Sequence, residues 1–234
     1  MAVAPVHGHP MIAIDIDDVG PDVAAARAAI ALPAPVTLAF LPYAHDIVAL
    51  TREAQAAGHE LLVHVPMEPI DLAHNDPGPN ALLTNLPAAE ILRRLTWDLN
   101  RFQGYVGINN HMGSRFTANE ADMDLVLDVL KRRGLLFFDS RTSPRSVGAR
   151  LAAQLGVPVV SRDVFLDDSL RLDRIEAALA QTEEVARRSG RAIAIGHPHP
   201  TTLAALRQWL PAVQAKGFVL VPITALVRPP GVSG

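Results

Sequence analysis

Short apolar runs alternate with longer helical patterns along the whole chain. Runs rich in Val, Ile, Leu and Phe, each with the length of a buried strand, stand at 11–16, 36–40, 60–65, 106–109, 135–139, 157–160, 192–195 and 218–222. Between them, the apolar residues of Ala- and Leu-rich stretches repeat at helical spacing at 44–57, 87–102, 120–133, 147–155, 172–189 and 201–216. Glycine follows several of these stretches directly, as in AGHELLVHV and RGLLFFDS, and glycine commonly ends a helix.

Continuous apolar strands separated by helices predict a parallel sheet that is covered on both faces. Because the chain has many strands and lacks the glycine fingerprint of dinucleotide-binding folds, we expect a β/α barrel rather than an open sheet. The prediction is an α/β fold with one domain over 11–228, a single distorted or incomplete (β/α) barrel of about seven parallel strands. Residues 1–10 are expected to be a disordered leader and 229–234 a tail. Residues 68–85 form one long irregular stretch, and loops of that length are usually functional.

Bulk composition excludes several classes of protein. The chain is 49% hydrophobic and 19% charged, which provides a core and argues against global disorder. Its formal net charge is −3 and its basic residues are scattered, so no nucleic-acid partner is expected. The absence of cysteine rules out disulfides, thiolate metal sites and cysteine nucleophiles. No apolar run approaches the ~18 residues of a transmembrane segment, and no export signal is visible at the start of the chain.

Polar residues collect where the predicted strands end. In parallel α/β folds, ligands bind at the carboxyl ends of the strands. The residues at these positions are Asp17 and Asp18 after the first run, His64 at the third, Asn110 and His111 after the fourth, Asp139 at the fifth, and His197 and His199 after the seventh. Asp or His thus stands at the ends of five runs, although both are minority residues. We therefore expect most of these side chains to meet at one rim of the barrel.

These residue types indicate metal-assisted hydrolysis. Carboxylate and imidazole groups without thiolate suit Zn²⁺ or a similar divalent ion. In the adjacent pair Asp17 and Asp18, one carboxylate can bind the metal while the other accepts a proton from metal-bound water. A further histidine across the pocket can protonate a leaving group.

Each candidate also has a purely structural interpretation. Asp17 and Asp18 can cap a following helix, because Asp is a favoured capping residue. His64 and His111 can be core histidines that hydrogen bond to the backbone, and GHPHP can be a rigid turn. The isolated histidines His45, His59 and His74 are expected at the surface. The shared position of the other histidines at strand ends favours a joint metal site.

A series of long motifs follows in the order IAIDIDDVG, VTLAFLPYA, AGHELLVHVPMEP, NDPGPNALLT, GYVGINNHMGSRFT, LLFFDSRTSPRSV, RDVFLDD and AIAIGHPHP. In this order they resemble the divergent polysaccharide deacetylase family, a bacterial branch of the polysaccharide deacetylase superfamily. The resemblance spans about 11–227 and implies a barrel of the glycoside hydrolase/deacetylase type. It also implies a divalent metal, most readily zinc, an acetylated glycan as substrate, and a periplasmic or cell-envelope location.

The resemblance assigns roles to individual residues. Asp17 resembles the general base and His197 the late catalytic histidine, while the metal ligands are matched by Asp18, His64 and His111. The chain departs from the mainstream superfamily in two places, because HVPME lacks a second metal-binding histidine and NNHMGSR replaces an arginine–proline motif. Candidates for the surroundings of the metal or for substrate contacts are Glu68, Asn110, Ser114, Arg115, Asp139 and Arg141. Asp139 is expected to orient His197 as a carboxylate–imidazole pair.

Three functions remain open at this point. The first is a metal-dependent hydrolase that removes acetyl groups from a polysaccharide or cell-envelope glycan. The second is a metal-dependent hydrolase of another amide, ester or phosphate. The third is a non-catalytic carbohydrate-binding or envelope-associated protein with a degenerate pocket, although an aromatic content of 5% is low for a sugar-binding surface. The sequence does not specify an oligomeric state.

Overall fold

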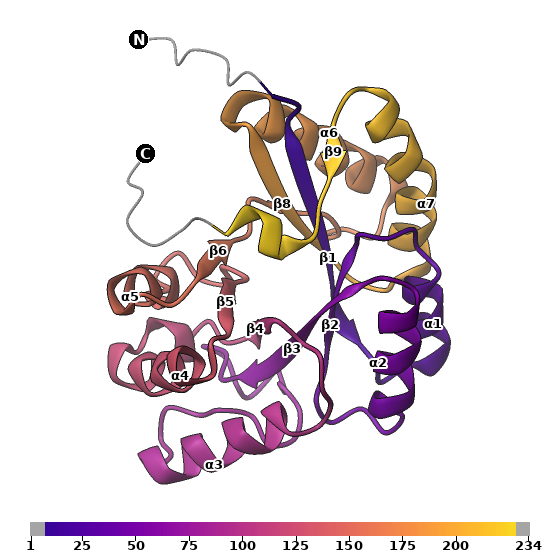
Figure 1. Ribbon diagram of the computed structural model, residues 1–234. Coiled ribbons are helices and arrows are strands. Elements are labelled where there is room, and N and C mark those ends of the chain that lie inside the picture. The colour runs from indigo at the N-terminus through magenta and orange to yellow at the C-terminus, as the bar shows by residue number, and fades with distance from the viewer. Residues whose placement is uncertain (1–7, 228–234) are drawn as a thin grey trace, which may run out of the picture.

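The computed structural model describes residues 8–227 as one parallel sheet with helices packed against it (Figure 1). The strands are β1 (Met11–Val19), β2 (Thr37–Phe40), β3 (Glu60–Met67), β4 (Gly107–Met112), β5 (Leu136–Asp139), β6 (Val159–Ser161), β7 (Val164–Phe165), β8 (Arg191–Gly196) and β9 (Val219–Leu220). The helices are α1 (Val23–Ile30), α2 (Ile47–Ala56), α3 (Ala88–Leu99), α4 (Glu120–Arg133), α5 (Gly148–Leu155), α6 (Leu172–Ser189) and α7 (Pro200–Ala215), with short 3-10 turns at η1 (Phe116–Ala118) and η2 (Ile223–Leu226). The predicted alternation of strands and helices is confirmed.

The sheet has the order β6-β5-β4-β3-β2-β1-β8-β7, with β9 beside β1, and all neighbours are parallel. Its two edges, β6 and β7, belong to one stretch of chain and are separated only by Arg162 and Asp163. The N–H of Arg162 donates to Asp139 O at one edge, whereas that of Asp163 donates to Ile193 O at the other. The chain thus crosses the opening of the sheet, and the predicted incomplete α/β barrel is confirmed. The sheet has more strands than the predicted seven or so, and the strand without a predicted run is β7, which has only two residues.

The two faces of the sheet build two separate cores, because successive side chains of a strand point to opposite sides. In β1, Ile12, Ile14 and Ile16 join the large core beneath the helices. The second cluster consists of Ala13, Ala39, Leu62, Leu136, Phe138, Val160, Ile193, Ile195, Ile223 and Leu226. These buried residues come from strands and from η2, and none comes from an α-helix. The second cluster therefore fills the interior of the barrel.

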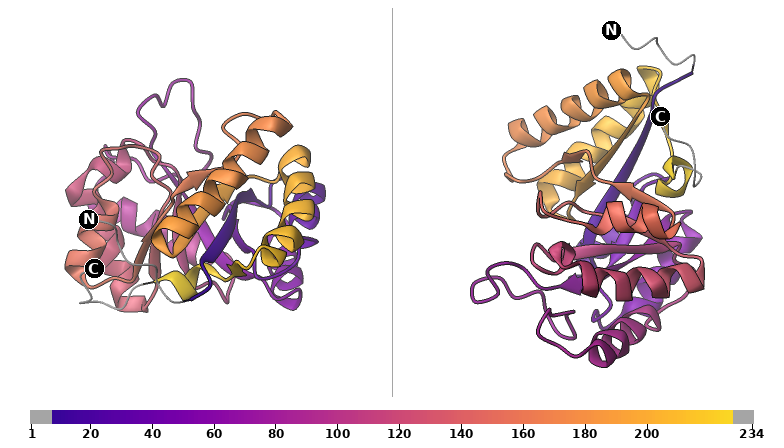
Figure 2. Two further views of the ribbon diagram at one scale, coloured as in Figure 1. Left: turned by 90° about the horizontal axis from the view of Figure 1, so that it is seen from above. Right: turned by 90° about the vertical axis from the view of Figure 1, so that its left-hand side faces the viewer.

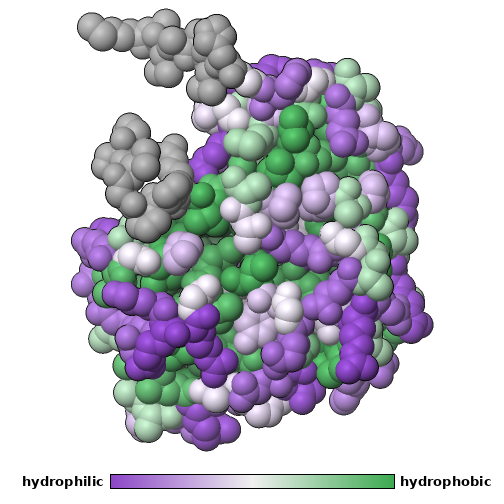
Figure 3. Space-filling model, in the orientation of Figure 1, coloured by the Kyte–Doolittle hydropathy of each residue, from purple (hydrophilic) through white to green (hydrophobic). Residues whose placement is uncertain are grey.

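The turn η2 closes the amino-terminal end of the barrel. The N–H of Ile223 donates to the hydroxyl of Thr37 (3.3 Å) at the start of β2, and the N–H of Thr224 donates to Glu60 Oε1 (3.1 Å) at the start of β3. Ile223 and Leu226 are held inside these strand ends and are buried. On the face that Figure 3 shows, hydrophobic residues reach the surface in several places between polar side chains.

Helix α1 is not among the predicted helices, and its start corrects one interpretation of the aspartates. Its cap is Asp22, whose carboxylate accepts hydrogen bonds from Ala24 N (2.9 Å) and Ala25 N (3.0 Å). A cap of this kind satisfies N–H groups that have no partner inside the helix. Asp17 and Asp18 therefore do not cap the helix that follows them.

The prediction of a surface position is wrong for His59 and right for His45 and His74. His59 is buried, with its ring nitrogens 2.8 Å from Val36 O and 2.9 Å from Ile30 O. Ile30 is the last residue of α1, so its carbonyl has no partner inside the helix. The side chain of His59 satisfies it and is drawn into the interior.

The predicted irregular segment between β3 and α3 projects from the body of the domain in both views of Figure 2. The predicted tail and most of the predicted leader lie outside the described residues. Within that leader, His9 Nδ1 lies 3.0 Å from Gly217 O, and Val219 N donates to Pro10 O (2.9 Å). Among the helices of residues 8–227, none combines the length and the apolar character needed to cross a membrane.

Candidate metal centre

The end of β1 is distorted in a way that places two consecutive aspartates at the same rim. In a regular strand, Asp17 and Asp18 would point to opposite faces. Here the pairing of β1 with β2 shifts register between Ile16 and Val19, and Asp18 has a φ of 57°. This left-handed conformation is unfavourable for a residue with a Cβ and costs about 1–3 kcal/mol. The bulge thus turns the Asp18 carboxylate toward the histidines of β3 and β4.

The same backbone conformation recurs at two neighbouring strand ends. Met112, the last residue of β4, has a φ of 52°, and Arg141, just after β5, has a φ of 51°. Non-glycine residues with positive φ concentrate at functional sites, where the surrounding structure holds the strain. The carboxyl end of the sheet therefore carries the backbone signature of a site.

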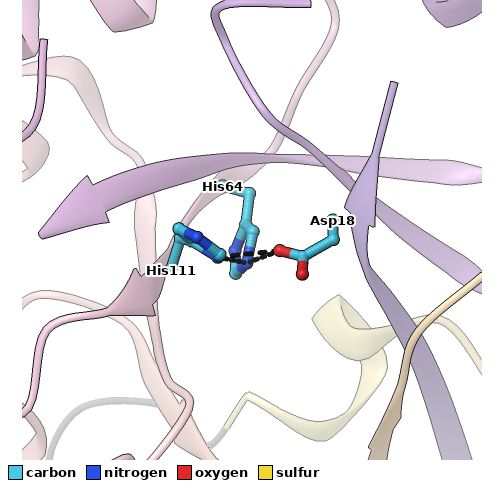
Figure 4. Close-up of side chains that lie close together, drawn as sticks. All are labelled: Asp18, His64 and His111. Atoms are coloured by element: carbon cyan, nitrogen blue, oxygen red, sulfur yellow. Dashed lines mark hydrogen bonds and ion pairs between the residues drawn. The ribbon is translucent and has the colours of Figure 1, made fainter. Parts of the chain in front are cut away.

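Three side chains from three strands converge at this rim. Asp18 Oδ1 lies 2.7 Å from His111 Nδ1 and 3.1 Å from His64 Nε2. The two nitrogens are 3.2 Å apart (Figure 4). Each residue thus offers one ligand atom to the same small space, and the structure brings together the three residues predicted to bind metal.

The chemistry of this cluster fits a divalent cation. Asp18 Oδ1 is a buried carboxylate oxygen without a well-aligned hydrogen bond in the described part of the chain, although both nitrogens lie close to it. The other nitrogen of His64, Nδ1, lies 2.7 Å from Asn109 Oδ1 and donates its proton there. That bond fixes the tautomer and leaves Nε2 with a free lone pair. Two imidazoles and one carboxylate are a common ligand set for zinc.

The charges of the cluster also suit a cation. Burial raises the pKa of Asp18, but hydrogen-bond contacts with His111 and His64 outweigh it and hold the pKa well below its usual range. Burial lowers the pKa of His64, but the negative charges of Asp17 and Asp18 outweigh it and raise the pKa above its usual value. The site is therefore arranged to hold positive charge, which a metal ion can supply in place of protons.

Asn109 connects the metal ligands to a second buried carboxylate. Its Nδ2 donates to Asp17 Oδ1 (2.6 Å) and to Asp15 Oδ2 (3.2 Å). Asp17 Oδ2 lies 3.7 Å from His64 Nε2. Burial, with the charge of Asp17 as a second cause, raises the pKa of Asp15 well above its usual range. Asp17 is thus the carboxylate that adjoins the metal ligands without belonging to the cluster.

His197 faces the cluster from the end of β8. Its Nε2 lies 3.9 Å from Asp18 Oδ2, and its Nδ1 donates to Asp167 Oδ1 (2.9 Å). Asp167 Oδ2 also accepts hydrogen bonds from the N–H of His197 (2.7 Å) and from the hydroxyl of Thr202 (2.8 Å). Burial lowers the pKa of His197, but the hydrogen bond that it donates to Asp167 and the charge of Asp17 raise it to about 9. His197 therefore carries a proton beside the cluster.

The prediction that Asp139 orients His197 is wrong, because Asp167 does so. Asp139 instead accepts hydrogen bonds from the N–H of Arg141 (2.8 Å) and the hydroxyl of Ser146 (2.7 Å), and so shapes the turn after β5. Asp167 lies in the motif RDVFLDD, two residues after a strand too short to be recognised from its pattern. Asn109 is easier to assign to the site than Asp167, because it pairs in register with His64 and lies on the same side of the sheet.

The remaining predicted residues hold the loops of the rim and do not contact the three candidate ligands. Glu68 Oε2 accepts from the N–H (2.6 Å) and the hydroxyl (2.7 Å) of Thr84, which anchors the long segment after β3. That segment is also bonded through Ile70, whose N–H donates to Ser114 Oγ (2.9 Å) and whose carbonyl accepts from Arg115 (2.7 Å).

Asn110 of β4 and Arg141, just after β5, lie at neighbouring strand ends. Asn110 Oδ1 accepts from Ser140 N (3.0 Å), and its Nδ2 donates to Met112 O (2.7 Å), which ties the ends of β4 and β5 together. Arg141 is exposed. Both residues therefore shape the rim, and only Arg141 has a side chain open to solvent for contact with a substrate.

A hollow of about 560 Å³ opens onto the cluster between α1 and α7. Asp18 and His197 form part of its wall, together with small or apolar residues such as Ala24, Ala28 and Leu203. The arrangement therefore offers a candidate metal site, a neighbouring carboxylate, a protonated imidazole and space for a ligand. These are the groups that hydrolysis of an acyl bond requires.

The sequence matches the divergent polysaccharide deacetylase family over residues 14–227. An uncharacterised protein from Haemophilus influenzae is 36% identical over 199 residues, which are 85% of this chain and 70% of that protein. The uncharacterised protein YibQ from Escherichia coli is 38% identical over 197 residues, which are 84% of this chain and 61% of YibQ. The chain therefore spans about two thirds of the length of these relatives.

Solved structures agree with this match. An uncharacterised protein from Agrobacterium tumefaciens has a TM-score of 0.92 and 30% identity, covering 94% of this chain and 90% of that one. A family 4 carbohydrate esterase from Streptomyces lividans, in complex with acetate, shares the fold with a TM-score of 0.53 and 18% identity, covering 96% and 98%. A family 4 pseudoenzyme from Bacillus anthracis does so with a TM-score of 0.58 and 14% identity, covering 97% and 70%. By the match over most of its length, this chain belongs to the divergent polysaccharide deacetylase family.

Proposed function

We propose that the protein is a metal-dependent hydrolase that removes acetyl groups from a glycan of the cell envelope. The observation that carries the proposal is the convergence of Asp18 Oδ1, His64 Nε2 and His111 Nδ1, with the Asp17 carboxylate on one side and His197 on the other. Zinc is the ion that this ligand set suits best. The glycan substrate is supported by the family and by the deacetylases and carbohydrate esterases that share the fold. A periplasmic or envelope location follows from such a substrate.

Different residues of the site perform different steps of the proposed reaction. A divalent ion held by Asp18, His64 and His111 would polarise the acetyl carbonyl and acidify the attacking water. Asp17, held in place by Asn109, accepts the proton that this water loses as its oxygen bonds to the carbonyl carbon. The bond from that carbon to nitrogen or oxygen then breaks.

His197 completes the reaction on the other side of the cluster. It donates the proton on Nε2 to the departing amine or alkoxide, while Asp167 holds Nδ1 and stabilises the imidazolium. The products are acetate and the deacetylated sugar.

A second function is favoured by specific departures from the mainstream superfamily. The motif HVPME lacks a second metal-binding histidine, NNHMGSR replaces the arginine–proline motif, and the fold includes a pseudoenzyme. The alternative is a glycan-binding protein of the envelope that keeps the metal cluster without turnover. The two functions differ in what Asp17 does, because a binder has no need of a general base.

The decisive experiment replaces Asp17 by asparagine, which is nearly isosteric and cannot accept the proton. We expect Asp17→Asn to keep its zinc affinity in calorimetry and to lose about 10²–10⁴-fold in acetate release. The matched control is Asp128→Asn, the same change at an exposed residue of α4, which keeps both. Zinc-loaded wild type that releases no acetate from acetylated chitin oligomers, peptidoglycan or xylan would contradict the deacetylase and favour the binding function.

A further inference from the structure

An exposed aromatic ring lies next to the catalytic histidine. The ring centroid of Phe165, at the end of β7, is 5.3 Å from that of His197, and the residue is 37% exposed. The guanidinium of Arg162 lies 5.2 Å from the Phe165 centroid and donates to Ser140 O (2.7 Å) and Arg141 O (3.0 Å). Because these carbonyls fix the guanidinium, its cation–π contact holds the Phe165 ring in place.

A hollow of about 320 Å³ adjoins this ring, between the segment after β7 and the first turns of α6. Its polar side chains are Asp168, Ser169, Arg174 and Gln181. The side chains of Asp168 and Gln181 form no hydrogen bond within residues 8–227, so they are free to bind a ligand. The volume lies in the range of about 300–1,000 Å³ that is typical of small-molecule sites.

The position of His197 decides which part of a substrate reaches this hollow. In the proposed reaction, His197 gives its proton to the amine or alkoxide that leaves, and a sugar ring carries that group. The sugar must therefore lie on the His197 side of the cluster. Besides Asp18, His197 and other polar residues, the larger hollow between α1 and α7 is lined by alanine, proline and leucine. It has no Phe, Tyr or Trp in its wall, whereas Phe165 lines the smaller one.

We propose that Phe165 and the hollow beside it form a saccharide subsite for the sugar unit next to the one that is deacetylated. The inference rests on the proposed function for the position of the reacting sugar. A sugar unit has an apolar C–H face and a rim of hydroxyls. The aromatic ring matches the face, and the carboxylate, guanidinium and amide of Asp168, Arg174 and Gln181 match the hydroxyls.

The test compares a long and a short substrate. For each variant, the ratio of kcat/KM for chitotetraose to kcat/KM for N-acetylglucosamine isolates contacts outside the reacting sugar. We expect Phe165→Ala to lower this ratio about tenfold, through KM for chitotetraose, and Phe165→Tyr to restore it. We expect Gln181→Ala to lower the ratio several-fold, since it removes one hydrogen-bonding group.

Trp97→Ala is the matched control. Trp97 is also 37% exposed and also has an arginine beside it, with Arg101 4.7 Å from the ring, but it lies on α3 outside the hollow. The Trp97→Ala ratio should equal that of the wild type. A Phe165→Ala ratio that equals the Trp97→Ala ratio would overturn the subsite.

Calorimetry with chitotetraose separates the subsite from catalysis. If zinc-loaded wild type hydrolyses no substrate, the proposed function fails, while the subsite still requires chitotetraose to bind. The affinity should then fall about tenfold in Phe165→Ala and stay at the wild-type value in Trp97→Ala. Chitotetraose that does not bind the wild type, or that binds both variants equally, would overturn the subsite whatever the activity.

Discussion

The two ends of the barrel are built from the same strands and have opposite characters. Toward the amino-terminal end, the inward positions are apolar, as at Ala13 of β1 and Leu62 of β3, and η2 seals them. Two residues further along, the same faces carry Asp15 and His64. On one face of a strand, a step of two residues therefore separates a side chain that packs in the barrel interior from one that belongs to the candidate site. The fold can change its chemistry at one end while its stability is maintained at the other.

Backbone conformation shows the same division. At the carboxyl end, Asp18, Met112 and Arg141 adopt left-handed conformations that are unfavourable for residues with a Cβ. In η2, the described residues Ile223 to Leu226 have no positive φ, and Ile223 is fully buried. Substitutions at the rim should therefore affect ligand binding more than folding, and substitutions in η2 should do the reverse.

The largest expected effect is the loss of the metal site in His111→Ala. Removing one of three ligands should lower zinc affinity by more than about 100-fold in calorimetry. Zinc at 100 times its dissociation constant should stabilise the wild type by about 2.7 kcal/mol, and this gain should disappear in the variant. Urea unfolding of the metal-free variant should stay within about 1 kcal/mol of the wild type, since the side chain lies at the rim. A large loss of metal-free stability would contradict the separation of the two ends.

The opposite result is expected for Ile223→Ala in η2. Removing a fully buried isoleucine side chain should destabilise the protein by about 2–5 kcal/mol, from lost burial and from the cavity that remains. In a domain of this size, the melting temperature should fall by roughly 5–15 °C. Zinc affinity at a temperature where the variant is folded should match the wild type. A tenfold weaker zinc affinity in the folded variant would show that the two ends are coupled.

A smaller effect on zinc affinity is expected to distinguish two adjacent asparagines of β4. Asn109→Ala removes the amide that fixes the tautomer of His64 and holds Asp17, so zinc affinity should fall about 10–100-fold. Asn110→Ala is the matched control, because that amide bonds to the loop after β5 and not to the cluster. Both variants lose buried hydrogen bonds and should be destabilised to a similar extent, by about 1–3 kcal/mol. Equal zinc affinities in the two variants would remove Asn109 from the metal site.

The sequence was enough to predict that the site residues lie close together, because the carboxyl ends of parallel strands share one edge of the sheet. That rule alone places Asp18, His64 and His111 together, with His197 beside them. Their detailed arrangement depends on the backbone, which sequence patterns do not show. The bulge at Asp18 is one example, since strand alternation predicts that Asp17 and Asp18 diverge.

Contacts between distant segments were the least predictable part. Asp167 pairs with His197 across 30 positions, whereas the sequence favoured Asp139 because that residue ends a recognisable strand. His59 resembles a surface residue until the unpaired carbonyl at the end of α1 is known to lie beside it. In each case the partner is set by packing and not by local pattern.

The place of η2 along the chain also has a consequence for synthesis. Its residues Ile223 and Leu226 fill the barrel interior, yet they follow all the other strands and helices of residues 8–227 in sequence. A nascent chain can therefore form its strands and outer helices while inner residues such as Leu62 and Phe138 remain uncovered. We therefore expect the barrel interior to close only after η2 has left the ribosome, and its inner apolar residues to stay exposed until then.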